Sequence, residues 1–296
     1  MINVQSVKAL IHLIDDPNDQ VFEHVRNQLK SYGKDAIPYL ENSWESEDFG
    51  ILFQHRIENI IHEIQFEESK ENLRSWKNSV DKDLLKAAII IAKYQYPGLI
   101  EEVVCQEIEK IRKDIWLEIN SNQTAFEKIN IFNKVFYEIH HFKGNTKSFH
   151  SPLNSFINTV LETKKGNPLT MSLIYSIIAQ KLEIPVFGVN LPNHFVLCYM
   201  DENKTQLMMD DKSKYGVLFY INTYSKGKIF YENDIVQFLA QLKIPAERSH
   251  FEPCSNTIII QRMLSNLIAS FQQVGNVEKV EELISLRSVF EDREEN

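Results

Sequence analysis

The sequence has few of the residues that cross-link small domains, and it has no long hydrophobic run. Its three cysteines, Cys105, Cys198 and Cys254, are an odd number without a Cys-x-x-Cys pair, which argues against a disulfide framework and a zinc ribbon. No apolar run is longer than Ala87 to Ala92, whereas a membrane-spanning helix needs roughly 20 residues. No secretory signal opens the sequence, so we expect a cytoplasmic protein that is not embedded in a membrane.

An excess of basic residues is also absent. Lys and Arg total 32 against 41 Asp and Glu, which gives a formal net charge of −9. Because an acidic surface repels a phosphate backbone, nucleic acid is not an expected partner. The 296 residues are 43% hydrophobic, which is enough to build two or three structural units.

Residues 1–98 carry apolar side chains at helical spacing in several short segments. One stripe comprises Val7, Leu10, Ile11 and Ile14, and a later one comprises Ile57, Ile60 and Ile64. Successive helix pairs of this kind resemble HEAT-like repeats. We expect an N-terminal helical region without a complete apolar core of its own, packed onto the rest of the protein.

Residues 99–245 combine helices with a predicted sheet. Ser151-Pro152 and Asn167-Pro168 each pair a helix N-cap with proline at the first helical position, so each predicts a helix start. After Leu182 the apolar period changes from that of a helix to that of a strand. The predicted strands are 186–189, 194–199, 206–209 and 217–221. The pattern predicts an α+β core in which the helix after Pro168 packs on an antiparallel sheet.

Residues 246–296 predict a helical hairpin that turns at Gly275-Asn276. A single hairpin of this kind resembles one tetratricopeptide-like unit, which is more often a structural cap than a binding site. We expect it to pack onto the core.

A thiol hydrolase built from a helix and an antiparallel sheet needs three side chains. A cysteine at the helix N-terminus is activated by the positive end of the helix, a His on the neighbouring strand takes its proton, and an Asp orients the His. His194 opens one predicted strand, and Asp210 ends the next after a short turn. Adjacent antiparallel strands joined in this way bring the two side chains to the same end of the sheet.

Several sequence motifs resemble those of the SirB-type transglutaminase-like proteins. They are Phe132-Asn133-Lys134-Val135-Phe136, Phe142-Lys143-Gly144-Asn145, Asn154-Ser155-Phe156, Lys165-Gly166-Asn167-Pro168-Leu169 and the run from Ile184-Pro185 to Asn193-His194-Phe195. A weaker similarity extends to Arg262-Met263-Leu264-Asn266-Leu267. The resemblance implies a transglutaminase-like (papain-like) α+β fold flanked by helices, and it implies no particular activity.

The same resemblance places Pro168 at the position of the catalytic cysteine, and proline has no nucleophile. His194 and Asp210 are then a residual dyad. Asn193 stands where relatives prefer glycine, so we expect it to adopt a left-handed backbone conformation. Asp211 stands where relatives usually have proline, and we prefer Asp210 as the partner of His194.

Four asparagines, Asn145, Asn154, Asn167 and Asn193, make up the predicted ligand-binding set. All four fall within the motifs that carry the resemblance. For Asn154, hydrogen bonds to backbone are the more expected role, because buried amides are usually satisfied within the fold.

Other residues could replace the missing thiol. Cys198 lies on the same strand as His194, about 13 Å away at roughly 3.3 Å per residue, so we expect it to be core packing. Thr170 and Ser172 follow Pro168 on its helix and are alternative nucleophiles. A metal site from His150, His194 and Asp210 lacks close ligand spacing, and we expect no metal and no cofactor.

Two functions remain open. The first is a non-catalytic protein that binds a peptide or protein partner in the cleft where the resemblance places the active site, and this is the one we favour. The second is a hydrolase or transferase that uses His194 and Asp210 with a water or hydroxyl nucleophile.

Overall fold

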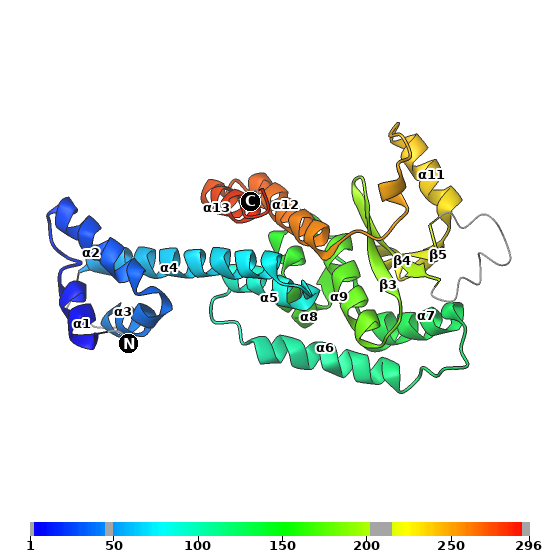
Figure 1. Cartoon of the computed structure of the whole chain (residues 1–296), viewed down its shortest axis with the longest axis horizontal. Helices are drawn as coiled ribbons and strands as arrows, with labels where there is room; N and C mark the ends of the chain where they lie inside the picture. Colours follow the sequence, from blue (N-terminus) through cyan, green and yellow to red (C-terminus); the bar gives the residue numbers. More distant parts are fainter. Residues whose placement is uncertain (1–2, 45–49, 202–214, 292–296) are drawn as a thin grey trace. The chain divides into compact units, whose positions relative to one another are not determined.

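The computed structural model describes residues 3–44, 50–201 and 215–291 (Figure 1). The protein packs as two compact units, Met1–Ser75 with Lys93–Pro97 and Trp76–Ala92 with Gly98–Asn296. No helix in these described ranges combines the length and the apolar character that crossing a bilayer requires.

The first unit is helical, as its periodicity predicts. Its elements are α1 (Val4–His12), α2 (Asp19–Ser31), the 3-10 helix η1 (Gly33–Ala36), α3 (Ile37–Trp44) and most of α4 (Ile51–Asn78). Local capping begins two of these helices, because the side chains of Asn3 and Asn18 accept hydrogen bonds from the first backbone N–H groups of α1 and α2. Gly33 has a φ of +59°, which lets the backbone turn sharply after α2.

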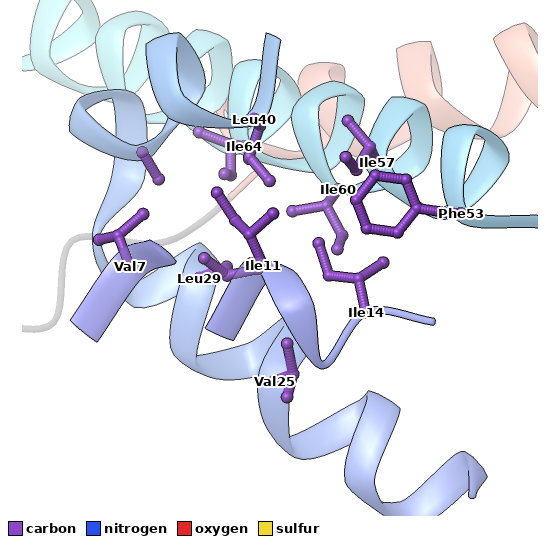
Figure 2. Packing of buried hydrophobic residues seen from close by; sticks show 11 residues of the cluster. Val7, Ile11, Ile14, Val25, Leu29, Leu40, Phe53, Ile57, Ile60 and Ile64 are labelled. Carbon is purple, nitrogen blue, oxygen red and sulfur yellow. The ribbon is translucent and has the colours of Figure 1, made fainter. Parts of the chain in front are cut away.

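A hydrophobic core lies within this first unit. Figure 2 shows 11 of its buried side chains, which come from α1, α2, η1, α3 and α4 and the residue Ile14. Val7, Leu29 and Phe53 are each 0% exposed. The expectation that the N-terminal region lacks a complete core is therefore wrong. Each helix buries only one stripe, but the stripes face one another, and together they exclude water.

The second unit holds the remaining helices. They are α5 (Leu84–Gln95, whose last residues belong to the first unit), α6 (Glu101–Trp116), α7 (Ala125–Asn133), the π-helix η2 (Lys134–Ile139), η3 (Pro152–Ser155), α8 (Ile157–Thr163), α9 (Pro168–Lys181), η4 (Thr223–Ser225), α11 (Glu232–Gln241), η5 (Arg248–His250), α12 (Asn256–Gln273) and α13 (Val277–Ser288). The Ser151-Pro152 signal starts only the short η3, and α8 begins after it. The Asn167-Pro168 signal starts the long helix α9.

The sheet is antiparallel, as predicted. Its order is β3 (Val186–Leu191), β4 (His194–Met200), β5 (Val217–Asn222) and β6 (Lys228–Phe230). The sequence pattern missed β6. The predicted strand 206–209 and both Asp210 and Asp211 lie outside the described residues.

Helix α9 is the centre of the second unit, and every residue from Leu169 to Ala179 is buried. A helix that is apolar on all sides is covered on all sides, and α9 contacts β3, β4, α6, α8 and α12. The predicted α+β core, with the Pro168 helix packed on the sheet, is confirmed. A parallel pair of short strands, β1 (Lys143–Gly144) and β2 (Lys165–Gly166), leads into its N-terminus.

The predicted C-terminal hairpin consists of α12 and α13. Gly275 has a φ of +74°, and the side chain of Asn276 caps the first turn of α13. α12 contacts both β3 and α9, so the hairpin packs on the core as expected.

Candidate functional site

A cavity of about 260 Å³, the α9 cavity, opens where the first turn of α9, the β3–β4 turn and one face of α12 meet. Residues from the segment before η3 complete its wall. The lining residues are Phe149, His150, Asn167, Pro168, Leu169, Asn193, His194, Phe195, Arg262, Asn266, Ala269, Ser270 and Gln273.

The N-terminus of α9 forms one wall of this cavity. The Asn167 Oδ1 atom accepts a hydrogen bond from the Thr170 backbone N–H at 2.9 Å, and its Nδ2 donates to Ser155 Oγ at 2.8 Å. Pro168 occupies the first helical position, where a missing N–H costs nothing. The positive end of the helix therefore meets the cavity at a residue that has no nucleophile.

The β3–β4 turn forms a second wall. Leu191 and His194 are paired across the hairpin, and Pro192 and Asn193 make the turn between them. Asn193 has a φ of +57°, which confirms the expected left-handed conformation. This tight turn places both Asn193 and the His194 side chain at the cavity.

His194 is held in its neutral form. Burial lowers the pKa of its imidazole, and the positive charge of Arg262 lowers it further. A hydrogen bond with the side chain of Asn222 opposes these effects in part. The net pKa lies below the ordinary value of a histidine, so the ring is uncharged at neutral pH and can accept a proton.

Asn222 is a residue that the sequence analysis missed. It ends β5, the strand that pairs with β4, and its Oδ1 also accepts from the Ser225 backbone N–H at 3.1 Å. The next residue, Thr223, is held by a buried hydrogen bond, which the Tyr137 hydroxyl donates to its carbonyl at 2.8 Å. Asn222 meets the same criterion as Asp210, since it is a polar residue directly after a predicted strand, here 217–221.

Arg262, on α12, is the second residue that the sequence analysis did not single out. Its Nη1 donates to Asn190 Oδ1 at 2.6 Å and to the Leu191 carbonyl at 2.8 Å, and its Nη2 donates to the His194 carbonyl at 3.3 Å. The guanidinium therefore holds both strands of the hairpin that presents His194. Burial lowers the pKa of Arg262, and the nearby thiol of Cys254 opposes this in part.

Asn145 and Asn154 are not among the described lining residues of the cavity. Asn145 Nδ2 donates to Asn154 Oδ1 at 2.8 Å. Asn154 Nδ2 donates to the carbonyls of Ser148 and Phe149 at 2.7 and 3.0 Å. Their amides thus fix the segment that carries Phe149 into the lining. Of the four predicted ligand-binding asparagines, the structure brings Asn167 and Asn193 to the cavity.

The alternative nucleophiles are engaged elsewhere. Thr170 Oγ1 donates to Asn167 Oδ1 at 3.2 Å, and Ser172 Oγ lies 2.7 Å from Thr223 Oγ1. Cys198 is fully buried, and burial raises the pKa of its thiol to about 12. Within the described ranges, neither His150 nor His194 belongs to a group of three side chains whose ligand atoms lie within 4.8 Å of one another.

Sequence comparisons relate this protein to known ones. Residues 102–265 match the family described as the Transglutaminase-like superfamily. The sequence is 24% identical over 251 residues to F-box only protein 21 of Homo sapiens, a match that spans 76% of this chain and 38% of that protein. It is 31% identical over 133 residues to a UPF0162 protein of Xylella fastidiosa, spanning 41% of this chain and 45% of the relative. A UPF0162 protein of Vibrio cholerae is 22% identical over 188 residues, spanning 62% and 65%. No solved structure matches.

Proposed function

The chain belongs to the transglutaminase-like superfamily, and from that premise we propose that it binds a peptide or protein segment in the α9 cavity without covalent catalysis. Within the superfamily we group it with the SirB-type proteins, on the Gly166-Asn167-Pro168 and Pro192-Asn193-His194-Phe195 motifs. The N-terminal helices serve as structural support in this proposal, whereas α12 of the C-terminal hairpin supplies one wall of the binding cavity.

The observation that carries the proposal is Pro168 at the first position of α9. A covalent step needs a thiolate or an activated hydroxyl where the helix N-terminus and the histidine converge. Pro168 supplies neither, and no cysteine is among the described lining residues. Among the lining residues, the imidazole of His194 is the group best suited to proton transfer. No covalent nucleophile accompanies it at the start of the helix.

The composition of the lining supports peptide binding. The lining combines the apolar side chains of Phe149, Leu169 and Phe195 with the amide side chains of Asn193 and Asn266. An amide can donate to a peptide carbonyl and accept from a peptide N–H, while apolar surface accepts side chains.

The second candidate is a hydrolase or transferase that uses His194 and Asp210 with a water or hydroxyl nucleophile. The lowered pKa of His194 favours it, because a neutral imidazole is able to act as a general base. Such a base acting on water lacks the covalent step that makes amide cleavage fast, so this candidate ranks second.

Replacing Pro168 by Cys tests whether this position corresponds to the nucleophile. The new thiol is expected to have a pKa about one unit or more below that of an ordinary cysteine, because the helix N-terminus and His194 both favour the thiolate. The measurement is the rate of iodoacetamide alkylation as a function of pH. Glu101→Cys, at the first position of α6, is the matched control, since it has a helix N-terminus without a histidine of this site. Equal thiol pKa values in the two variants would contradict the assignment of position 168 to the nucleophile position.

A turnover assay separates the two candidates. The wild-type protein is incubated with a glutamine-containing peptide and a fluorescent primary amine, and separately with a chromogenic ester. We expect no product above the level of His194→Ala, and no effect of alkylating the cysteines on peptide binding. Turnover that survives alkylation and disappears in His194→Ala would establish the second candidate. Turnover that is abolished by alkylating the cysteines would contradict both candidate functions.

A further inference from the structure

The charge of the α9 cavity differs from that of the whole protein. The protein has a net charge of −9, yet no Asp or Glu is among the described residues that line the cavity. The lining instead includes the guanidinium of Arg262 and the imidazoles of His150 and His194. A half-buried cation among polar and apolar groups, without a carboxylate beside it, is unusual because desolvating an unpaired charge is costly.

The contacts of Arg262 leave this charge uncompensated among the described residues. All three of its hydrogen bonds go to neutral oxygens, the Asn190 amide and the carbonyls of Leu191 and His194. Neutral acceptors satisfy N–H groups but do not cancel the charge. No ion pair of Arg262 occurs in the described parts of the protein, although other arginines there are paired.

The same contacts leave part of the guanidinium without a hydrogen-bond acceptor. A guanidinium has five N–H donors. Both donors of Nη1 and one of Nη2 are used, so the Nε donor and the second Nη2 donor have no acceptor among the described residues. Nε and Nη2 form one edge of the planar group, and that edge matches the two oxygens of a carboxylate.

We propose that the cavity binds a segment through a carboxylate, which pairs with the free edge of Arg262. The carboxylate belongs either to an acidic side chain or to the C-terminus of a polypeptide. This inference rests on the proposed peptide-binding function and names the chemical class of its ligand. The binding group thereby supplies the negative charge that the described lining lacks.

Binding of a carboxylate also has a measurable effect on His194. The charge of Arg262 lowers the pKa of this histidine. A bound carboxylate cancels that charge, so it raises the pKa of His194. By linkage, the same ligand binds more tightly when His194 is protonated.

The test uses the full-length protein and four peptides as probes. They are acetyl-Ala-Ala-Glu-Ala-Ala-amide, the same peptide with Gln for Glu, acetyl-pentaalanine with a free C-terminus, and acetyl-pentaalanine amide. Binding is followed by NMR of the His194 ring, assigned with His194→Gln. At least one carboxylate peptide is expected to bind about tenfold or more tightly than its neutral counterpart, as a charged hydrogen bond implies, and to raise the pKa of His194. Which of the two carboxylate peptides binds identifies the source.

Variants then locate the contact. Arg262→Lys keeps the charge but loses the carboxylate-matching edge, and Arg262→Gln loses both, so affinity for the carboxylate peptide falls in that order. Arg248→Gln is the matched control, because it removes one positive charge from an exposed ion pair with Glu252 away from the cavity lining. The pKa shift of His194 in the wild-type protein needs no substitution, and it decides the matter if the Arg262 variants unfold.

Each contrary result has its own meaning. If neutral and acidic peptides bind equally and perturb His194, the proposed function stands and the carboxylate inference is overturned. The inference also fails if Arg262→Lys and Arg262→Gln bind the acidic peptide as the wild type does. If none of the four peptides binds at millimolar concentration, both the inference and its peptide-binding premise are rejected.

Discussion

Arg26 in the first unit donates to the carboxylates of Glu23 and Glu63, whereas Arg262 at the α9 cavity donates only to neutral oxygens among the described residues. Lys30 adds a second cation to Glu63 at 2.8 Å. Arg26 and Lys30 are thus paired with carboxylates of the first unit itself. The second unit uses one cation to hold the hairpin of His194 and leaves its charge without a counter-ion in the part of the protein that the structure describes.

The difference shows how structural and functional demands can be told apart. Ion pairs on a half-exposed helix surface contribute little and need no further explanation. An unpaired cation in a cavity costs stability, and proteins accept such costs mainly at functional sites. Three measurements test this comparison.

The first measurement tests whether the two regions are independent. Phe53→Ala removes a side chain that is 0% exposed in the core of the first unit. We expect the free energy of unfolding of that unit to fall by about 4 kcal/mol, as for other large-to-small core changes. Hydrogen exchange should accelerate in α1, α2 and α4, while α9 and peptide binding in the cavity stay unchanged. A loss of protection in α9 would show that the cavity depends on the first unit's core.

The second measurement compares the two arginines directly. Arg262→Met leaves Asn190 and two hairpin carbonyls without their charged donor, and we expect the free energy of unfolding to fall by about 3 kcal/mol. Arg26→Met removes a partly exposed ion pair and should cost about 1 kcal/mol or less. Urea unfolding of both variants at low and high salt gives the values. Only the effect of Arg26→Met is expected to shrink at high salt. Equal losses of unfolding free energy in the two variants would contradict the proposed difference between the two arginines.

The third measurement separates the regions by pH. The native pKa of His194 is lowered by its burial and by Arg262, so between that value and about 6.5 the unfolded state binds more protons. Stability is therefore complete above about pH 6.5 and falls as the pH drops towards the native pKa. His194→Gln should flatten the stability profile in this window.

Glu63 acts at lower pH. Burial by itself raises its pKa, but the bonds from Arg26 and Lys30 outweigh burial, and the net pKa is lowered. Its contribution is present above about pH 4.3 and is lost as the pH falls through the native pKa. Urea unfolding from pH 7.5 to 3.5 should show the two windows in sequence, with Glu63→Gln flattening only the acidic one. A single window removed by either substitution would contradict the separate assignments.

Much of the fold could be predicted because its signals are local. An asparagine cap followed by Pro168 starts α9 through contacts within one helical turn, and Asn193 tolerates a left-handed turn by itself. The change of apolar period after Leu182 separates helix from sheet without knowledge of any partner.

The candidate site was predictable in part. His194 and Pro168 lie in recognisable motifs, and the structure brings both to one cavity. Asn222 was missed because its contact with His194 depends on which strand pairs with β4 and in which register. Arg262 was missed because its hydrogen-bond partners lie far earlier in the sequence, at separations of 72, 71 and 68 residues.

Residue identity and short-range sterics fix the start of α9, the change from helix to sheet after Leu182, and the absence of a nucleophilic group at Pro168. Long-range packing alone closes the stripes of the first unit into a core, brings Arg262 and His194 to one cavity, and places Asn222 within hydrogen-bond reach of His194. Such contacts join segments far apart in the sequence. They arise when burial of apolar surface selects one packing, and no local pattern encodes that choice.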